Sequence, residues 1–150
     1  MQVYGLLPDA SGASATTSII AEGLSHPNGV AARWKACSAD SDCGAGVSCD
    51  MANLFCQGAT LYVAEWERVL QWPLADAMAA LDGTGSKLTV GPANILVDGL
   101  PTSDGGHHAW KFIRFGPDGK LYVPVGSPCN ICTVDEDGNA IDDQVRTNAG

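Results

Sequence analysis

The sequence has few basic residues and no long apolar run. Lysine and arginine number 8 against 17 aspartates and glutamates, which gives a formal net charge of −9. Such a chain is repelled by phosphate polyanions and anionic membrane surfaces, because binding to either needs clustered lysine and arginine. No apolar run approaches the roughly 20 residues that span a bilayer. We therefore expect no nucleic-acid partner and no membrane span.

Several short motifs are also missing from the sequence. It has no Gly-x-Ser-x-Gly nucleophile motif, no phosphate-binding loop and no His-Glu-x-x-His zinc motif, so the enzyme classes that use them are not expected. The first ten residues lack the basic and apolar regions of a signal peptide. We expect either that an export signal lies outside this chain or that the protein is not exported.

Glycine and proline, by contrast, are frequent, with 18 and 8 residues that separate short apolar runs. This distribution favours an all-β fold over a helical bundle. Apolar or alternating runs between turn residues predict strands, and one alanine- and leucine-rich run predicts a short helix. The predicted strands are residues 17–22, 29–33, 60–64, 68–72, 94–97, 110–115 and 120–125, and the predicted helix is 74–81.

The cysteines indicate an oxidising compartment. Cys37, Cys43, Cys49 and Cys56 lie in a segment of small and polar residues, about 35–58, which cannot bury a core and so needs covalent links. Two disulfides are predicted, and three pairings remain open. A zinc site is the alternative, but the spacing lacks paired C-x-x-C elements and the segment has no histidine. We expect an extracellular or periplasmic protein.

A second cysteine pair, Cys129 and Cys132, forms a C-x-x-C motif. A redox pair of the thioredoxin type requires a helix directly after it, and the residues that follow do not predict one. A small structural disulfide is the preferred interpretation.

Two parts of the chain repeat one pattern. Gly23-Leu24 precedes a predicted strand and then Leu61-Tyr62-Val63, and Gly99-Leu100 precedes Leu121-Tyr122-Val123 in the same way. Repeated four-stranded units are typical of β-propeller blades. The sequence predicts about two blades, near 17–98 and 99–150, with the cysteine-rich segment as an insertion in the first. Because a propeller has roughly four to eight blades, the chain is expected to be part of a longer protein.

Two stretches carry a family resemblance. The run HHAWKFIRFGPDGKLY begins at His107, and the earlier unit contains SIIAEGLSHPNGVA and LYVAEWERVLQW. They resemble the glucose/sorbosone dehydrogenase family, soluble six-bladed propellers that use pyrroloquinoline quinone (PQQ), and in particular its sorbosone dehydrogenase-like branch. The matching stretches cover about two thirds of the chain.

The resemblance implies a function and a set of site residues. In the family, a histidine eight positions before the Gly-Pro-Asp turn takes a proton from a sugar hydroxyl while hydride passes to the quinone. That position is His108 here, and a neutral imidazole suits a general base near neutral pH. His107 and Asn28 are weaker candidates for contact with the substrate. The implied partners are a sugar and an electron acceptor, and the implied cofactors are PQQ and Ca²⁺.

The sequence also departs from the family pattern. Ser127 stands where the glucose dehydrogenase branch has an aspartate that orients the histidine, and a serine cannot stabilise an imidazolium by charge. The cationic residues and calcium ligands that hold PQQ lie on later blades of the family. Two alternatives therefore stay open: a calcium-dependent lactonase on a similar propeller, with Glu65 as its one obvious carboxylate, and a non-catalytic module that binds carbohydrate or protein.

Overall fold

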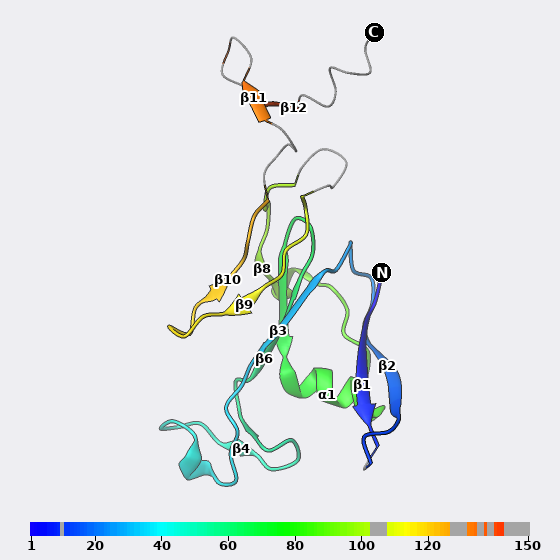
Figure 1. The fold of residues 1–150 in the computed structure, drawn as a ribbon. Coiled ribbons are helices and arrows are strands. Elements are labelled where there is room, and N and C mark those ends of the chain that lie inside the picture. Colours follow the sequence, from blue (N-terminus) through cyan, green and yellow to red (C-terminus); the bar gives the residue numbers. More distant parts are fainter. Residues whose placement is uncertain (10, 103–107, 127–131, 135–136, 138–139, 143–150) are drawn as a thin grey trace.

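A computed structural model describes the chain except residues 10, 103–107, 127–131, 135–136, 138–139 and 143–150, and side chains are not described in 132–134 and 140–142 (Figure 1). Strands dominate it, with one nine-residue helix and two short 3-10 turns. The strands are β1 (Val3–Pro8), β2 (Ala15–Ala21), β3 (Gly29–Arg33), β4 (Cys49–Asp50), β5 (Phe55–Cys56), β6 (Thr60–Ala64), β7 (Val69–Pro73), β8 (Ile95–Val97), β9 (Arg114–Phe115), β10 (Leu121–Tyr122), β11 (Cys132–Val134) and β12 (Ala140–Asp142). The 3-10 turns are η1 (Asp40–Asp42) and η2 (Pro92–Asn94). The expectation of a mainly β fold is confirmed.

The largest sheet is antiparallel and has the strand order β3-β6-β7-β8. Each strand pairs with the next one along the chain within this sheet, so the four strands run up and down in sequence order. The middle strands carry the alternating apolar residues that predicted them: Leu61, Val63, Leu70 and Trp72 are buried. The predicted hairpin of 60–64 with 68–72 is therefore confirmed to within one residue.

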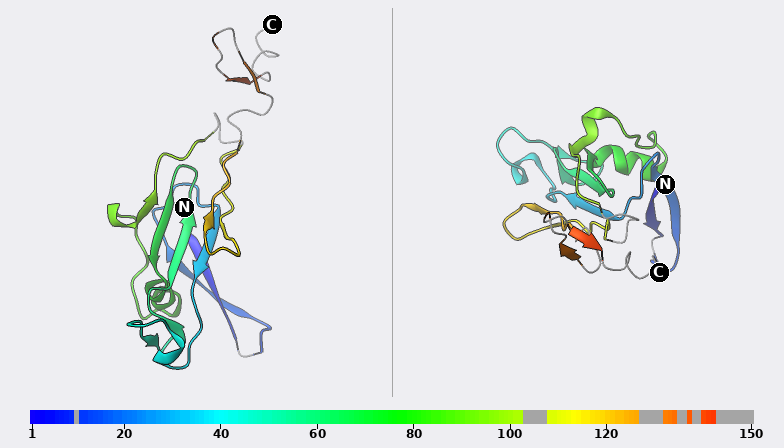
Figure 2. Two further views of the ribbon diagram at one scale, coloured as in Figure 1. Left: turned by 90° about the vertical axis from the view of Figure 1, so that its left-hand side faces the viewer. Right: turned by 90° about the horizontal axis from the view of Figure 1, so that it is seen from above.

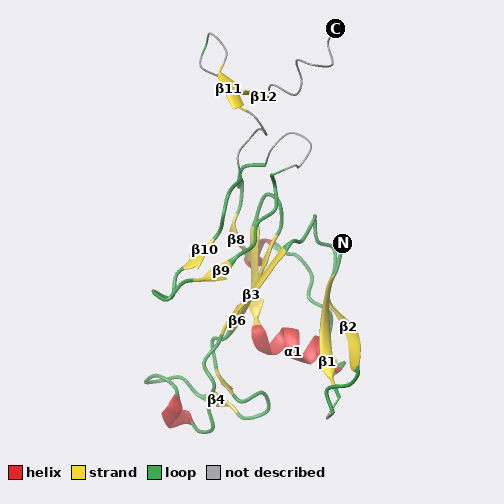
Figure 3. Ribbon diagram, in the orientation of Figure 1, coloured by secondary structure: helices red, strands yellow, loops and turns green. Residues whose placement is uncertain are grey.

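A helix and a hairpin cover one face of this sheet (Figure 3). Helix α1 (Leu74–Asp82) follows β7 directly and ends at Gly83, whose φ of 81° is the left-handed conformation that glycine adopts at helix ends. β1 and β2 form an antiparallel hairpin that packs against α1. β2 and α1 were expected from the sequence, whereas β1 was not.

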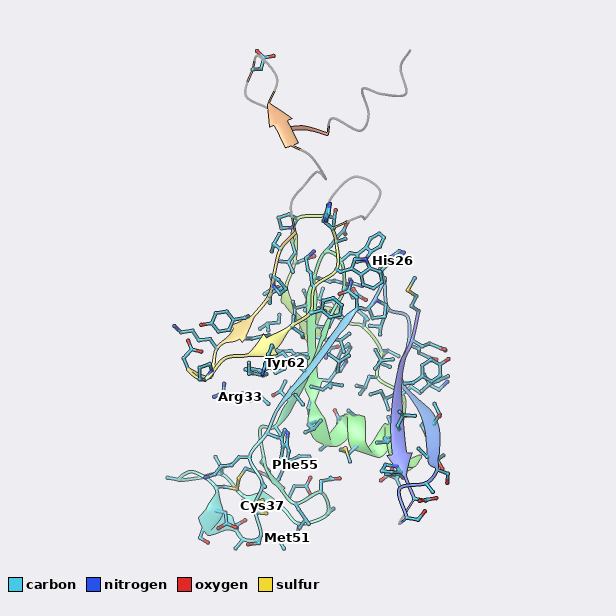
Figure 4. All side chains as sticks on the ribbon, in the orientation of Figure 1. His26, Arg33, Cys37, Met51, Phe55 and Tyr62 are labelled. Carbon is cyan, nitrogen blue, oxygen red and sulfur yellow. A yellow bond between two sulfur atoms is a disulfide. The ribbon has the colours of Figure 1, made fainter. Side chains whose placement is uncertain are left out.

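The cysteine-rich segment connects β3 to β6 and lies at one end of the sheet (Figures 1 and 4). Cys37 is bonded to Cys49 and Cys43 to Cys56, and these residues form a small buried cluster separate from the main core. The predicted pair of disulfides is confirmed, and one of the three open pairings is selected. Since all four thiols are oxidised, they provide no thiolate for zinc.

The second repeated unit differs from its prediction. The strands expected at 110–115 and 120–125 shorten to β9 and β10, which pair with each other in a separate two-stranded sheet. The backbone just before β9 packs closely on the start of β3, since a Cβ atom at Gly29 would lie 2.1 Å from the carbonyl oxygen of Lys111 and 3.1 Å from the nitrogen of Ile113. The side view in Figure 2 shows this part of the chain running alongside the larger sheet. β11 and β12 form a further antiparallel pair.

Candidate functional site

Four loops meet at the end of the large sheet opposite the disulfides. They are the approach to β3, the β6–β7 turn, the segment after β8 and residues 108–111. Figure 4 shows His26 at this end and Cys37 at the other. A cleft of about 500 Å³ lies here, lined by Ser25, His26, Glu65, Trp66, Glu67, Arg68 and Asp98.

Two aromatic rings form one wall of this cleft. The rings of His26 and Trp66 stack with centroids 3.9 Å apart and an angle of 15° between their planes. His26 has a φ of 50°, a left-handed conformation that few non-glycine residues adopt. The indole Nε1 of Trp66 is buried and has no hydrogen-bond partner among the described residues. A flat aromatic surface of this kind suits the apolar face of a sugar ring or another ring.

A buried carboxylate forms the floor of the cleft. Glu65 is 1% exposed and accepts hydrogen bonds from the backbone N–H of Ser25 at 2.6 Å and from Nε of Arg68. This ion pair raises the pKa of the Arg68 guanidinium above its ordinary value. Because both donors already occupy it, the Glu65 carboxylate is a structural group that holds the β6–β7 turn against the approach to β3.

A fully buried lysine lies behind the cleft. Lys111 is 0% exposed, and its Nζ donates hydrogen bonds to the carbonyl oxygens of Pro101 at 3.0 Å and Ala109 at 3.1 Å. Its backbone N–H donates to Oδ1 of Asn28 at 2.9 Å. Burial lowers the pKa of Lys111, and the carboxylate of Glu67 opposes this shift. Alternation in the predicted strand 110–115 allows one of its two charged residues to face solvent, and in the structure Arg114 is exposed and Lys111 is buried.

His108 is half-buried on the segment that Lys111 anchors. The chain near Gly126 passes directly over it, since a Cβ atom at Gly126 would lie 2.3 Å from the carbonyl oxygen of His108. On the other side, Asn28 joins this segment to His26, because Nδ2 of Asn28 donates to the carbonyl oxygen of His26 at 3.2 Å. The structure therefore links Asn28 directly to the segment of His108.

Other predicted site residues have different outcomes. His107, Ser127 and Cys129 lie outside the described residues, as does the side chain of Cys132, so their roles and the second cysteine pair stay predictions. Sequence reasoning had placed Glu65 at a hairpin but did not identify the cleft around Trp66 and Arg68. The sequence signal for this cleft was the run EWER, a cluster of charged and aromatic residues in one tight turn between apolar strands.

A second cleft, of about 530 Å³, lies near the disulfides, between β4–β5 and the ends of β6 and β7. It contains amide side chains from Gln57, Gln71 and Asn94 beside the ring of Phe55. Asn94 is already used in the fold, since its Nδ2 donates to the carbonyl oxygen of Gln71 at 3.2 Å. None of the predicted substrate or catalytic residues lines it.

Comparison with known proteins gives no match to a family model, to a curated protein or to a solved structure. Within the described part of the chain, no helix has the length and apolar character needed to cross a membrane.

Proposed function

We propose that this chain is the substrate-facing part of a sugar dehydrogenase of the glucose/sorbosone type, in which His108 takes the proton of a sugar hydroxyl. In this proposal the β3-β6-β7-β8 sheet is one propeller blade and the β9–β10 region belongs to the next. One observation carries the proposal: the segment of His108 is fixed beside Asn28 and His26 at the loop end of the sheet. Asn28 and Lys111, 83 positions apart in the sequence, are thereby joined by a hydrogen bond three residues from His108.

The surroundings suit a neutral polyhydroxylated ligand. The carboxylates of Glu67 and Asp98 line the cleft as hydrogen-bond acceptors for hydroxyl groups, and Trp66 offers an aromatic face. His108 does not line this cleft but lies on the neighbouring segment that Lys111 joins to Asn28, and a neutral imidazole can accept a proton near neutral pH. In the proposed role, His108 binds and deprotonates the hydroxyl while the cleft orients the ring.

The described residues do not fit PQQ. The cofactor carries three carboxylates, whereas the cleft has three carboxylates of its own against one guanidinium, that of Arg68, which Glu65 already occupies. The second nearby cation, on Lys111, is buried and hydrogen-bonded to carbonyl oxygens. Like charges would repel the carboxylates of the cofactor here, so PQQ requires residues outside this cleft.

A sugar-oxidation assay tests the proposal. The full-length protein that contains this chain is supplied with PQQ and Ca²⁺, and reduction of an artificial electron acceptor is followed with a panel of aldoses and sorbosone. We expect turnover with at least one sugar and a loss of about 10²- to 10⁴-fold in His108→Ala, the range for removal of a general base. Glu22→Ala, an exposed ion-pair residue away from the cleft, serves as the control and should keep full activity.

Two outcomes would reject this function. Full activity in His108→Ala would remove the assigned base. Hydrolysis of lactones without PQQ, with no sugar oxidation, would instead identify a lactonase, although the occupied carboxylate of Glu65 weighs against metal binding there. Sugar binding without any turnover would identify a non-catalytic module.

A further inference from the structure

Lys111 takes part in a closed ring of contacts around the candidate site. Its Nζ reaches the carbonyl oxygen of Pro101, and the neighbouring residue Leu100 donates its N–H to the carbonyl oxygen of Glu67 at 2.7 Å. Glu67 belongs to the same turn as Trp66, whose ring stacks on His26. The ring therefore passes from Lys111 through the segment after β8 to the β6–β7 turn.

The other half of the ring returns through Asn28. The carbonyl oxygen of His26 accepts from Nδ2 of Asn28, and Oδ1 of Asn28 accepts from the N–H of Lys111. A third link also starts at Lys111, since its Nζ donates to the carbonyl oxygen of Ala109, directly after His108. Lys111, which lies on one of the four loops that form the site, thus contacts two of the other three.

Burial of the Lys111 ammonium has a cost in desolvation free energy. A charged group loses its hydration on burial, and proteins retain such groups where the hydrogen bonds fix one arrangement. Among the described residues, Lys111 has no carboxylate within ion-pair distance, so its charge is stabilised by carbonyl dipoles. An apolar side chain of the same length would fill the space without this cost but would leave both carbonyl oxygens without a donor.

We propose that Lys111 is the positioning residue of this site: its ammonium holds the His108 segment against the segment after β8, and its backbone N–H holds it against Asn28. The positioning role rests on the proposed function of His108, whereas the hydrogen bonds of Lys111 are independent of that function. Loss of the ammonium should loosen the ring at the Pro101 and Ala109 carbonyls, while the bond from the Lys111 N–H to Asn28 stays, so the His108 segment shifts relative to the β6–β7 turn whose Trp66 stacks on His26.

Nuclear magnetic resonance of the histidine side chains tests this without any need for activity. The sequence has three histidines, so each imidazole signal can be assigned with single His→Gln variants. In Lys111→Met we expect the signals of His26 and His108 to shift by more than their line widths or to broaden, while methyl signals of the main core stay in place. Lys87→Met, which removes an exposed ammonium paired with Glu22, is the matched control and should leave both histidines unchanged.

Two further measurements keep the proposal testable if Lys111→Met fails to fold. Asn28→Ala breaks the ring at another point and should move the same two signals. In the wild-type chain, the ammonium protons of Lys111 should exchange with water more slowly than those of Lys87, because they are buried and hydrogen-bonded. Unchanged histidine signals in the folded variants, or equal exchange rates at the two lysines, would overturn the proposal.

An activity measurement then separates this role from the proposed function. In the full-length enzyme, Lys111→Met should lower kcat by about 10- to 100-fold, as expected when a reacting group is misplaced by about 1 Å, with a smaller change in KM. If His108→Ala keeps full activity, the catalytic proposal fails, and the resonance data still decide whether Lys111 fixes the ring.

Discussion

Replacement of Glu65 by glutamine removes one negative charge from the floor of the cleft and keeps the shape of the side chain. The carboxylate accepts from the N–H of Ser25 at 2.6 Å and from Nε of Arg68, with 1% of the residue exposed. A carboxylate can accept from both donors at once with its two oxygens. The glutamine amide has one oxygen, so its NH₂ group must face either Ser25 or Arg68, and one of these donors loses its acceptor.

The expected cost follows from these contacts. A hydrogen bond that involves a charged group contributes about 1.5–3 kcal/mol to stability. The Arg68 side chain is 27% exposed, so water can solvate part of the guanidinium after the change, which places the loss near the lower end of that range. We expect the free energy of unfolding to fall by about 2 kcal/mol in Glu65→Gln.

Urea unfolding of the wild type and the variant measures this difference. Glu22→Gln is the matched control, because Glu22 also pairs with a cation, Lys87 at 3.2 Å, but their side chains are 41% and 48% exposed. An exposed pair contributes less than about 1 kcal/mol, so this variant should remain close to the wild type. Equal losses of unfolding free energy in the two variants, or no loss in Glu65→Gln, would refute the assignment of Glu65 as the group that holds the β6–β7 turn against the approach to β3.

Three other changes have defined outcomes. Gly29→Ala places a Cβ atom 2.1 Å from the Lys111 carbonyl oxygen, so the strand must move away, and urea unfolding should show a loss of about 1–3 kcal/mol. The double variant of Cys43 and Cys56 to alanine opens a loop of sequence separation 13 and should cost about 3 kcal/mol locally, seen as faster hydrogen exchange in the cysteine-rich segment. The lowered pKa of Lys111 means that the unfolded chain binds more protons between that pKa and 10.5, so wild-type stability should rise with pH in this window relative to Lys111→Met.

The elements that the sequence predicts well are those set by local pattern. Alternating apolar residues identified β6 and β7, and the alanine- and leucine-rich run identified α1 to within one residue. Each of these elements buries the residues that its own periodicity predicts, so the local sequence is sufficient to predict where the element lies. The need for disulfides could also be predicted, because segment 35–58 has little to bury.

Other features depend on contacts between distant parts of the chain. The pairing of Cys37 with Cys49 could not be chosen from spacing, because four cysteines allow three pairings. Alternation in 110–115 allowed either charged residue to face solvent, and packing on Gly29 decided that Lys111 is the buried one. β9 has two residues, although its sequence predicted a strand over 110–115.

The candidate site combines both kinds of information. Asn28 and His108 were identified from sequence, and the structure joins their segments through Lys111, which the sequence did not single out from Arg114 as the buried charge. The charge of the cleft follows from the turn 65–68 and Asp98 together, which are more than 25 residues apart and share no pattern. The pairing of β8 with β7 brings Asp98, which follows β8, to the same end of the sheet as the turn 65–68.

The two ends of the sheet are held by different physical means, and this bears on function. Disulfides fix the end with the cysteine-rich segment, whose cluster is separate from the main core. Hydrogen bonds to buried charges fix the other end, where Glu65 and Lys111 are the two buried charged residues of the described chain. Hydrogen-bonded charges specify the relative positions of loops, whereas a covalent link mainly restricts the unfolded chain. The proposed role of His108 needs the first kind of constraint, because a proton acceptor must be held against a hydroxyl group, and hydrogen-bonded buried charges lie at the end of the sheet where the His108 segment is.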